Sequence, residues 1–350
     1  MGQMTPKIAV IGVGRWGQNH VRVCKDLQRK GVCGEIIICD SDKAAAQYVA
    51  RLNGIERWYT DIDEMLEREA LDGAILAAPT RLHADLALKL LPRCSVMVEK
   101  PISETLVQAE MMLESAEKNG RILAVGHVER FNPGVAALKK VADDLQRKEG
   151  IAYLGVQRIG PGPAGARTDY LGVAHDLLIH DVDVGMFLLG ALPKEVEALG
   201  VNGATAGRET EIAALMTFDN DAQTLASFRA SWRSGPTLKK RILQLQGYST
   251  FVTLDYILQS LTMERGVVDH APAKGFVDIL TTYRARDITE RLLITGQESE
   301  PLMLEDRNFL ECLATGKKPF VDGVAGYRAL RCVLAALDSM RSKGSVAIQW

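Results

Sequence analysis

The sequence lacks the features that would direct a protein to a membrane, to nucleic acid or to an oxidising compartment. Its formal net charge is -2 and its pI is about 6.3, so it has no basic excess for binding nucleic acid or an anionic membrane. Its six cysteines form no Cys-x-x-Cys pair and have no metal-ligand spacing. No signal peptide is evident, and no apolar run reaches the roughly 18 residues that a membrane span needs. We therefore expect a cytoplasmic protein with reduced thiols that binds no metal, membrane or nucleic acid.

The bulk composition is that of a globular protein with a substantial core. Hydrophobic residues make up 47% of the 350 residues and charged residues 25%. This length is sufficient for two ordinary domains or one large domain. Internal repeats and low-complexity tracts are not seen in the sequence, so a repeat architecture is not expected.

Short apolar runs alternate with helical periodicity from Lys7 to Val125. The runs lie at 8–11, 36–39, 74–77, 96–98 and 122–125. The helical stretches between them lie at 16–30, 43–52, 61–69, 82–91 and 103–119. Apolar strands without alternation, separated by helices, are typical of a parallel sheet covered on both faces. This pattern predicts an α/β fold, with a doubly wound Rossmann domain over residues 1–125.

The pattern changes after Gly126. Helices are expected at 133–146 and 173–189, and helical periodicity returns at 304–313 and 324–341. The segments between them have polar residues interleaved with apolar ones, and they lie at 195–201, 211–218, 223–232, 241–247 and 250–255. Such segments indicate strands of a largely antiparallel sheet with one solvated or partner-covered face. Residues 126–350 are therefore expected to form a second domain of the α+β type.

A glycine motif follows the first predicted strand. In "AVIGVGRWGQNH", Gly12, Gly14 and Gly17 form Gly-x-Gly-x-x-Gly at a strand-to-helix junction. In that setting the glycines let a pyrophosphate approach the backbone at a helix amino terminus. Arg15 and Trp16, inside the motif, are expected to contact the cofactor as well. The alternative is a glycine-rich turn in a fold that binds no nucleotide.

Acidic residues after the second predicted strand indicate which dinucleotide is bound. Asp40 stands where an acid bonds the adenine-ribose hydroxyls. Asp40 and Asp42 would repel a 2′-phosphate, whereas Lys43 is the one nearby residue that favours it. NAD is therefore expected rather than NADP.

Two further segments leave strands at the same carboxyl edge, where ligands bind in doubly wound sheets. The first contributes Ala78, Pro79 and Thr80, followed by His83, which either contacts the ribose or is an ordinary histidine near a helix start.

The second segment is Glu99-Lys100-Pro101, which ends the apolar run Val96–Val98. Glu99 and Lys100 are expected beside the nicotinamide, where a lysine can donate to a substrate oxygen and exchange its proton. The alternative is a Glu99–Lys100 surface pair.

Histidines and aspartates gather in "GVAHDLLIHDVDVGMFLLG". On a helix, Asp176, His180 and Asp183 have i, i+4 and i+7 spacing and share one stripe. Three interpretations stay open: a metal site with too few ligands, a structural polar cluster, and an Asp-oriented histidine that acts as an acid–base group.

Together, the glycine loop, Glu99-Lys100-Pro101 and the stretch from Asp176 to His180 resemble the glucose–fructose oxidoreductase / inositol dehydrogenase family over nearly the whole chain. The resemblance implies that Lys100, Asp176 and His180 are catalytic. Leu178 stands where the family usually has glycine. The resemblance also implies a large open antiparallel sheet in the second domain. That sheet commonly packs against another subunit, giving a homodimer or homotetramer.

Residues 125–133 and 158–183 resemble the branch of this family that oxidises the C3 hydroxyl of UDP-N-acetylglucosamine with NAD. A nucleotide sugar carries a pyrophosphate, which guanidinium groups bind well. For Arg130, Arg158 and Arg167 the alternative is ordinary surface charge. For the protein as a whole, the alternatives are a dehydrogenase of a free polyol and a sensor that binds NAD without catalysis. The candidate substrate contacts are Arg130, Asn132, Arg158, Arg167 and Asp183.

Overall fold

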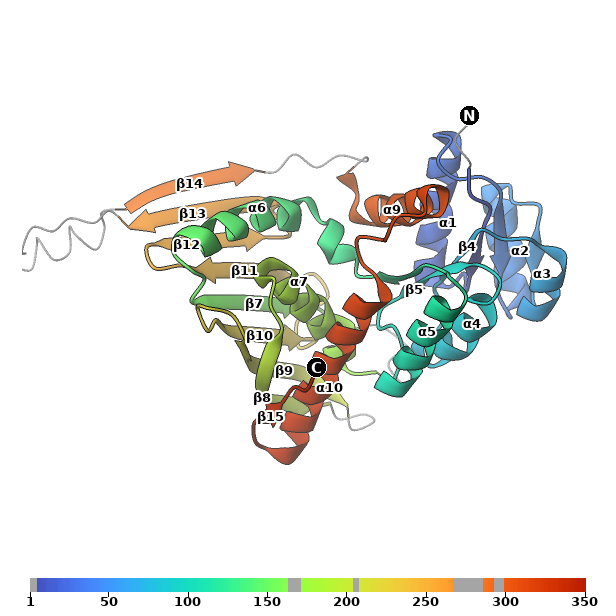
Figure 1. Cartoon of the computed structure of the whole chain (residues 1–350). Coiled ribbons are helices and arrows are strands. Elements are labelled where there is room, and N and C mark those ends of the chain that lie inside the picture. The colour runs from blue at the N-terminus through green and yellow to red at the C-terminus, as the bar shows by residue number, and fades with distance from the viewer. Residues whose placement is uncertain (1–4, 163–170, 204–207, 267–285, 293–298) are drawn as a thin grey trace, which may run out of the picture. The chain divides into compact units, whose positions relative to one another are not determined.

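The structure is a computed structural model that describes residues 5–162, 171–203, 208–266, 286–292 and 299–350 (Figure 1). The chain forms two compact units. The first comprises Met1–Asn132 and Gly296–Arg331, and the second comprises Pro133–Thr295 and Cys332–Trp350. The predicted division at residues 125 and 126 differs from these units chiefly because 296–331 returns to the first.

The first unit contains a six-stranded parallel sheet in the order β3-β2-β1-β4-β5-β6. The predicted Rossmann sheet is confirmed. The two-residue β3 was not predicted, because so short a strand leaves no periodic signal. The strands are β1 (Ile8–Ile11), β2 (Ile36–Cys39), β3 (Trp58–Tyr59), β4 (Gly73–Leu76), β5 (Ser95–Glu99) and β6 (Leu123–Gly126).

Local capping chemistry explains where the crossover helices begin. Asp42 and Asp61 each accept two backbone N–H bonds at a helix start, and Thr105 forms a capping box with Gln108. Because of the capping box, the helix begins at Leu106 rather than at the predicted residue 103. The helices are α1 (Arg15–Arg29), α2 (Lys43–Asn53), α3 (Ile62–Arg68), α4 (His83–Leu90) and α5 (Leu106–Lys118).

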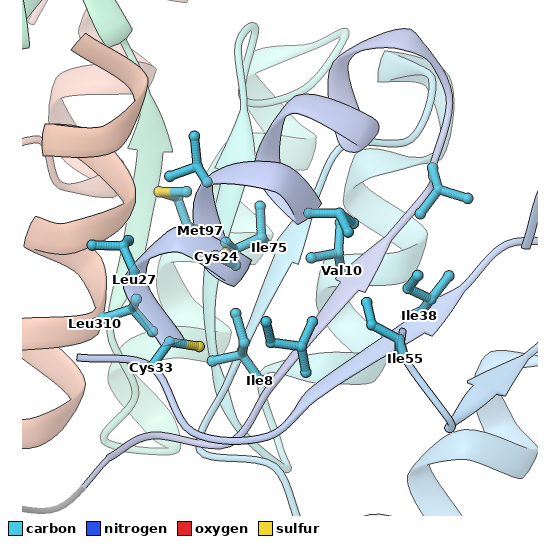
Figure 2. Packing of buried hydrophobic residues seen from close by; sticks show 14 of the residues in the cluster. Ile8, Val10, Cys24, Leu27, Cys33, Ile38, Ile55, Ile75, Met97 and Leu310 are labelled. Carbon is cyan, nitrogen blue, oxygen red and sulfur yellow. The ribbon is translucent and has the colours of Figure 1, made fainter. Parts of the chain in front are cut away.

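A helix from the last sixth of the chain completes the core of this unit. α9 (Pro301–Thr315) places Phe309 and Leu310 in one buried cluster with Ile8 of β1 and Leu27 of α1 (Figure 2). Its fit is tight, since a Cβ added at Gly73 of β4 would lie 2.6 Å from Leu313 Cδ1. The sequence predicted this helix, but it did not predict that the helix packs in the unit of the six-stranded parallel sheet.

The second unit contains a nine-stranded sheet in the order β14-β13-β12-β11-β7-β10-β9-β8-β15. All its pairings are antiparallel except that of β7 with β10, so the expected mostly antiparallel sheet is confirmed. Its central strand β7 was not predicted. The strands are β7 (Tyr153–Ile159), β8 (Pro193–Asn202), β9 (Glu209–Phe218), β10 (Leu225–Ser231), β11 (Lys240–Gln246), β12 (Thr250–Asp255), β13 (Ser260–Gly266), β14 (Arg286–Leu292) and β15 (Val346–Ala347).

One face of this sheet is covered by helices of its own unit, and the other, here called the open face, carries exposed side chains in the described residues. α6 (Pro133–Lys148) and α7 (Ile179–Leu189) pack on the covered face, and α10 (Gly323–Ser342) supplies residues to both units. The strand register places a run of exposed apolar side chains on the open face. These are Leu199, Val201, Leu215, Leu225 and Phe251.

Two further features of the described residues are the length of the helices and the state of the cysteine thiols. None of the helices in the described part of the chain is long and apolar enough to cross a membrane. All six cysteines are buried free thiols.

Candidate active site

The loop between β1 and α1 is shaped for close approach to a dinucleotide. Gly12 has φ +84°, and a Cβ there would lie 2.8 Å from Ala78 N. A Cβ at Gly17 would lie 1.9 Å from Gly12 O, so neither position accommodates a side chain. Gly14 begins α1 with no side-chain cap. An uncapped helix amino end behind a tight glycine turn fits a pyrophosphate.

The acid after β2 is tied to this loop. Asp40 Oδ2 accepts a hydrogen bond from Val13 N at 2.7 Å, and Asp40 Oδ1 accepts one from Asp42 N at 2.8 Å. Asp42 itself is used as the amino-terminal cap of α2. Asp40 is therefore the acid held next to the glycine loop, as contact with an adenine ribose requires.

The loops after β4 and β5 are joined by His83. The Nε2 atom of His83 lies 2.8 Å from Ala78 O, and its Nδ1 atom lies 2.9 Å from Pro101 O. Its side chain is 1% exposed, and this burial lowers its pKa, because desolvation disfavours the imidazolium. The position of His83 is that of a buried bridge between two loops, a role the sequence did not indicate. Its contact with the ribose stays a prediction, as do those of Pro79 and Thr80.

Glu99 is a buried anchor rather than half of a surface pair. It is 5% exposed, and its Oε1 atom accepts from Trp16 Nε1 at 2.6 Å and contacts His20 Nε2 at 3.0 Å. Its Oε2 atom accepts from the backbone N of Lys100 at 3.2 Å. A Cβ at Gly126 would lie 3.0 Å from Glu99 Oε1, so the neighbouring strand leaves room for the carboxylate. Lys100 thus follows a rigidly held residue at the carboxyl edge of the sheet.

The histidine–aspartate segment belongs to the second unit and begins with an unexpected turn. Residues Ala174–Leu178 form a π-helical turn that leads into α7, whereas the sequence predicted a regular helix from 173. π turns of this kind are frequent at functional sites. Glu209 of β9 accepts from Ala174 N at 3.0 Å, and a Cβ at Gly172 would lie 2.0 Å from Glu209 Oε1. A glycine and a carboxylate therefore hold the start of this turn.

Asp176 and His180 are half-buried. Asp176 Oδ2 accepts a hydrogen bond from the indole Nε1 of Trp232 at 3.1 Å. Asp183, the third member of the predicted stripe, is completely buried. Within the described residues, no group of three or more His, Cys, Asp or Glu side chains is arranged to hold a metal ion.

The residues expected to contact the substrate differ in their burial and in their hydrogen-bond partners. Arg158 is 2% exposed, its Nε donates to Asp181 Oδ1 at 2.8 Å, and its guanidinium lies 5.4 Å from the Tyr256 ring centroid. That ion pair already balances the charge of Arg158. Arg130 is half-buried, and Asn132 donates to Glu129 Oε2 at 3.2 Å. Arg167 lies outside the described residues, and substrate contact by any of these residues stays a prediction.

Sequence reasoning missed four residues that take part in these arrangements: His20, Asp306, Trp232 and Glu209. Of these residues, only Asp306 could have been recognised from the sequence pattern. It is a charged residue within the apolar face of α9, between Leu302 and Phe309, and it is completely buried. A buried acid on an apolar stripe calls for a partner. Here the partner is His20.

Two family models match the chain. The model of an oxidoreductase family with an NAD-binding Rossmann fold matches residues 6–127, and the model of its C-terminal alpha/beta domain matches residues 167–348.

Individual relatives match over almost their whole length. The chain is 29% identical to scyllo-inositol 2-dehydrogenase (NAD(+)) of Bacillus subtilis, covering 96% of this chain and 94% of that protein. It is 28% identical to UDP-N-acetylglucosamine 3-dehydrogenase of Acidithiobacillus ferrooxidans, covering 94% and 95%. An oxidoreductase domain protein from Kribbella flavida has the same fold, with a TM-score of 0.86, 19% identity, and coverage of 99% and 100%. The chain therefore belongs to the glucose–fructose oxidoreductase / inositol dehydrogenase family, and it is an oxidoreductase whose cofactor is NAD.

Proposed function

We propose that this protein oxidises a secondary hydroxyl group of a sugar or polyol with NAD, and that its substrate is UDP-N-acetylglucosamine, which it converts to the 3-keto sugar. The observation that carries the proposal is the co-occurrence of Lys100 after the anchored Glu99 with Asp176 and His180 on the π turn and α7. A protein that only senses NAD needs none of these three groups. Their presence therefore favours an enzyme.

The chain's residues divide the work as follows. The glycine loop, the amino end of α1 and Asp40 bind and orient NAD, which supplies the acceptor for the hydride that leaves the carbinol carbon. Lys100 and His180 are the acid–base groups, and one of them accepts the hydroxyl proton as the ketone forms. Asp176, which accepts a hydrogen bond from Trp232, orients His180 in this proposal. The products are the ketone, reduced cofactor and one proton.

The choice of UDP-N-acetylglucosamine rests on two supports. Residues 125–133 and 158–183 resemble the branch that acts on this sugar, and a relative with that name is 28% identical over 94% of the chain. A second candidate, scyllo-inositol or a related free polyol, is favoured by the relative that is 29% identical over 96% of the chain. These two substrates differ in the need for a pyrophosphate site.

The test is a direct comparison of the two substrates. The protein is incubated with NAD and UDP-N-acetylglucosamine, or with NAD and scyllo-inositol, and NADH is followed at about 340 nm. Oxidation of a secondary alcohol by NAD near neutral pH is usually uphill. Glutamate and a 3-keto-sugar aminotransferase are therefore added to consume the ketone, and the 3-amino product is measured by mass spectrometry. A 3-amino product supports the proposal. NADH formation from the polyol alone would transfer the assignment to the second candidate.

We also propose that the open face of the second sheet packs against a second copy of the chain, giving a homodimer or homotetramer. Exposed Leu199, Leu215, Leu225 and Phe251 on one face of one sheet support this, because apolar side chains gathered on one surface often mark a protein–protein interface. Leu215→Arg should shift the mass in light scattering toward the monomer, whereas Leu52→Arg, at an exposed site of α2, should not. An unchanged mass for the first variant would contradict the proposal. The buried free thiols support a reduced, cytoplasmic location as a further proposal.

A further inference from the structure

A chain of buried polar side chains connects α9 to the lysine turn inside the first unit. Asp306 Oδ1 lies 2.8 Å from His20 Nδ1, and His20 Nε2 lies 3.0 Å from Glu99 Oε1. Asp306 and His20 are completely buried, and Glu99 is 5% exposed. The contact between Asp306 and His20 spans 286 positions of sequence. Such a cluster far from the surface requires a physical reason, since buried charges are costly unless paired.

The geometry defines the charge state of the histidine. A neutral imidazole has one N–H, yet both ring nitrogens of His20 face carboxylate oxygens at hydrogen-bond distance. Both bonds form when His20 is an imidazolium between two carboxylates. Burial raises the pKa of Asp306, while the charge of the facing imidazolium and its hydrogen bond oppose that rise. Burial alone would lower the pKa of His20, but the charges and hydrogen bonds of Asp306 and Glu99 outweigh it and raise the pKa well above its usual value. Within the described residues, Cys24 Sγ also lies 3.7 Å from Asp306 Oδ2, and Trp16 Nε1 donates to Glu99 Oε1.

The chain ends on the residue next to the proposed acid–base lysine. Glu99 accepts hydrogen bonds from Trp16 and from the backbone N of Lys100. If the imidazolium were lost, Glu99 would be a buried carboxylate short of a partner, and it would rotate or take up a proton. Either change would weaken the hydrogen bond that the backbone N of Lys100 donates to Glu99.

We infer that His20 and Asp306 are positioning residues, which act through Glu99 to hold Lys100 in its working place. The inference rests on the proposed role of Lys100 in oxidation. It also assigns a task to α9, which lies in the part of the chain matched by the C-terminal family model rather than the NAD-binding one. If its role were purely structural, Asp306 would only hold α9 against α1. Its replacement would then have no specific effect on the position of Lys100.

The first arm of the test uses kinetics. Asp306→Asn keeps the shape of the side chain and removes its charge, and Glu311→Gln makes the same change at an exposed site of the same helix. We expect Asp306→Asn to lower kcat by up to about 100-fold, as a misplacement near 1 Å does, with the Kd for NAD unchanged. The double variant with Glu99→Gln should be no slower than Glu99→Gln alone, because residues that act through one another are not additive. Additive losses, or equal kcat for Asp306→Asn and Glu311→Gln, would overturn the inference.

The second arm does not depend on turnover. In ¹⁵N-histidine NMR, the His20 signals, assigned by their loss in His20→Gln, should be those of an imidazolium at pH 7 and should titrate at lower pH in Asp306→Asn. In ¹³C-dimethyl-lysine NMR, the Lys100 signal, assigned with Lys100→Met, should move in Asp306→Asn and in His20→Gln but not in Glu311→Gln. A neutral His20 at pH 7, or an unmoved Lys100 signal, would refute the positioning role. Absence of oxidation by the wild-type protein would instead refute the proposed function, so the two failures are distinguishable.

Discussion

Replacing Gly17 by alanine tests the cofactor loop most sharply. The added Cβ would lie 1.9 Å from the carbonyl oxygen of Gly12 and 2.9 Å from its carbonyl carbon, and both are backbone atoms that cannot rotate away. The first separation must grow to the 3.4 Å of an ordinary contact. The start of α1 must therefore move away from the loop that follows β1, where we expect the pyrophosphate to bind.

The size of the effect follows from this clash. Inserting a methyl group into a packed site costs about 1–3 kcal/mol. If that cost falls on the bound state, NAD affinity drops by roughly 5- to 150-fold, since about 1.4 kcal/mol is tenfold. Isothermal titration calorimetry with NAD measures this directly, and no substrate is needed.

A matched control separates the clash from the general loss of a glycine. Gly31 has φ +73° and no atom within 4 Å of an added Cβ, so Gly31→Ala strains the backbone without a collision. It should lower the Tm through a left-handed penalty of about 1–2 kcal/mol and leave the Kd for NAD unchanged. Wild-type affinity in Gly17→Ala would refute the assignment of this loop. Equal losses in the two variants would show that general destabilisation is the cause.

Three further outcomes follow from the site. Asp40→Ala should weaken NAD binding and reduce discrimination against NADP, and comparable wild-type turnover with both cofactors would make the role of Asp40 wrong. Lys100→Met and His180→Ala should each lower kcat by about 100- to 10,000-fold while calorimetry still detects NAD binding, and near-normal turnover in both would contradict the proposed catalytic groups. Trp232→Phe removes the donor to Asp176, a hydrogen bond to a charged group worth about 1.5–3 kcal/mol, so kcat should fall by roughly 10- to 150-fold. An unchanged pH–rate profile and kcat in that variant would exclude a role for the indole.

The helix predicted at 173–189 shows which features sequence periodicity can predict and which it cannot. Its 3.6-residue spacing predicted one stripe for Asp176, His180 and Asp183, and the helix exists. The π turn at Ala174–Leu178 widens the first turn, and Asp183 is buried while the other two are half-buried. The turn depends on Glu209 from β9, a residue too distant in sequence for the periodicity to report.

Arg158 shows a different limit. Its charge and its place at the start of the resembling segment 158–183 made it a candidate for a pyrophosphate, but charge alone cannot tell a ligand contact from an internal ion pair. The sheet places Arg158 on β7, a strand that was not predicted, and there it meets Asp181. Without β7, that partner could not be inferred.

Local periodicity and motifs that span few residues were enough to predict the parallel sheet, the glycine loop, Asp40 and the exit of Lys100 at the carboxyl edge. The tertiary structure alone decided the return of α9 to the first unit, the bridge of His83 between two loops, the bond from Trp232 to Asp176, and the buried chain from Asp306 through His20 to Glu99. The physical reason is distance along the chain. A contact between residues 20 and 306 forms only when a complete sheet and two helices pack against each other, and no local pattern records that packing.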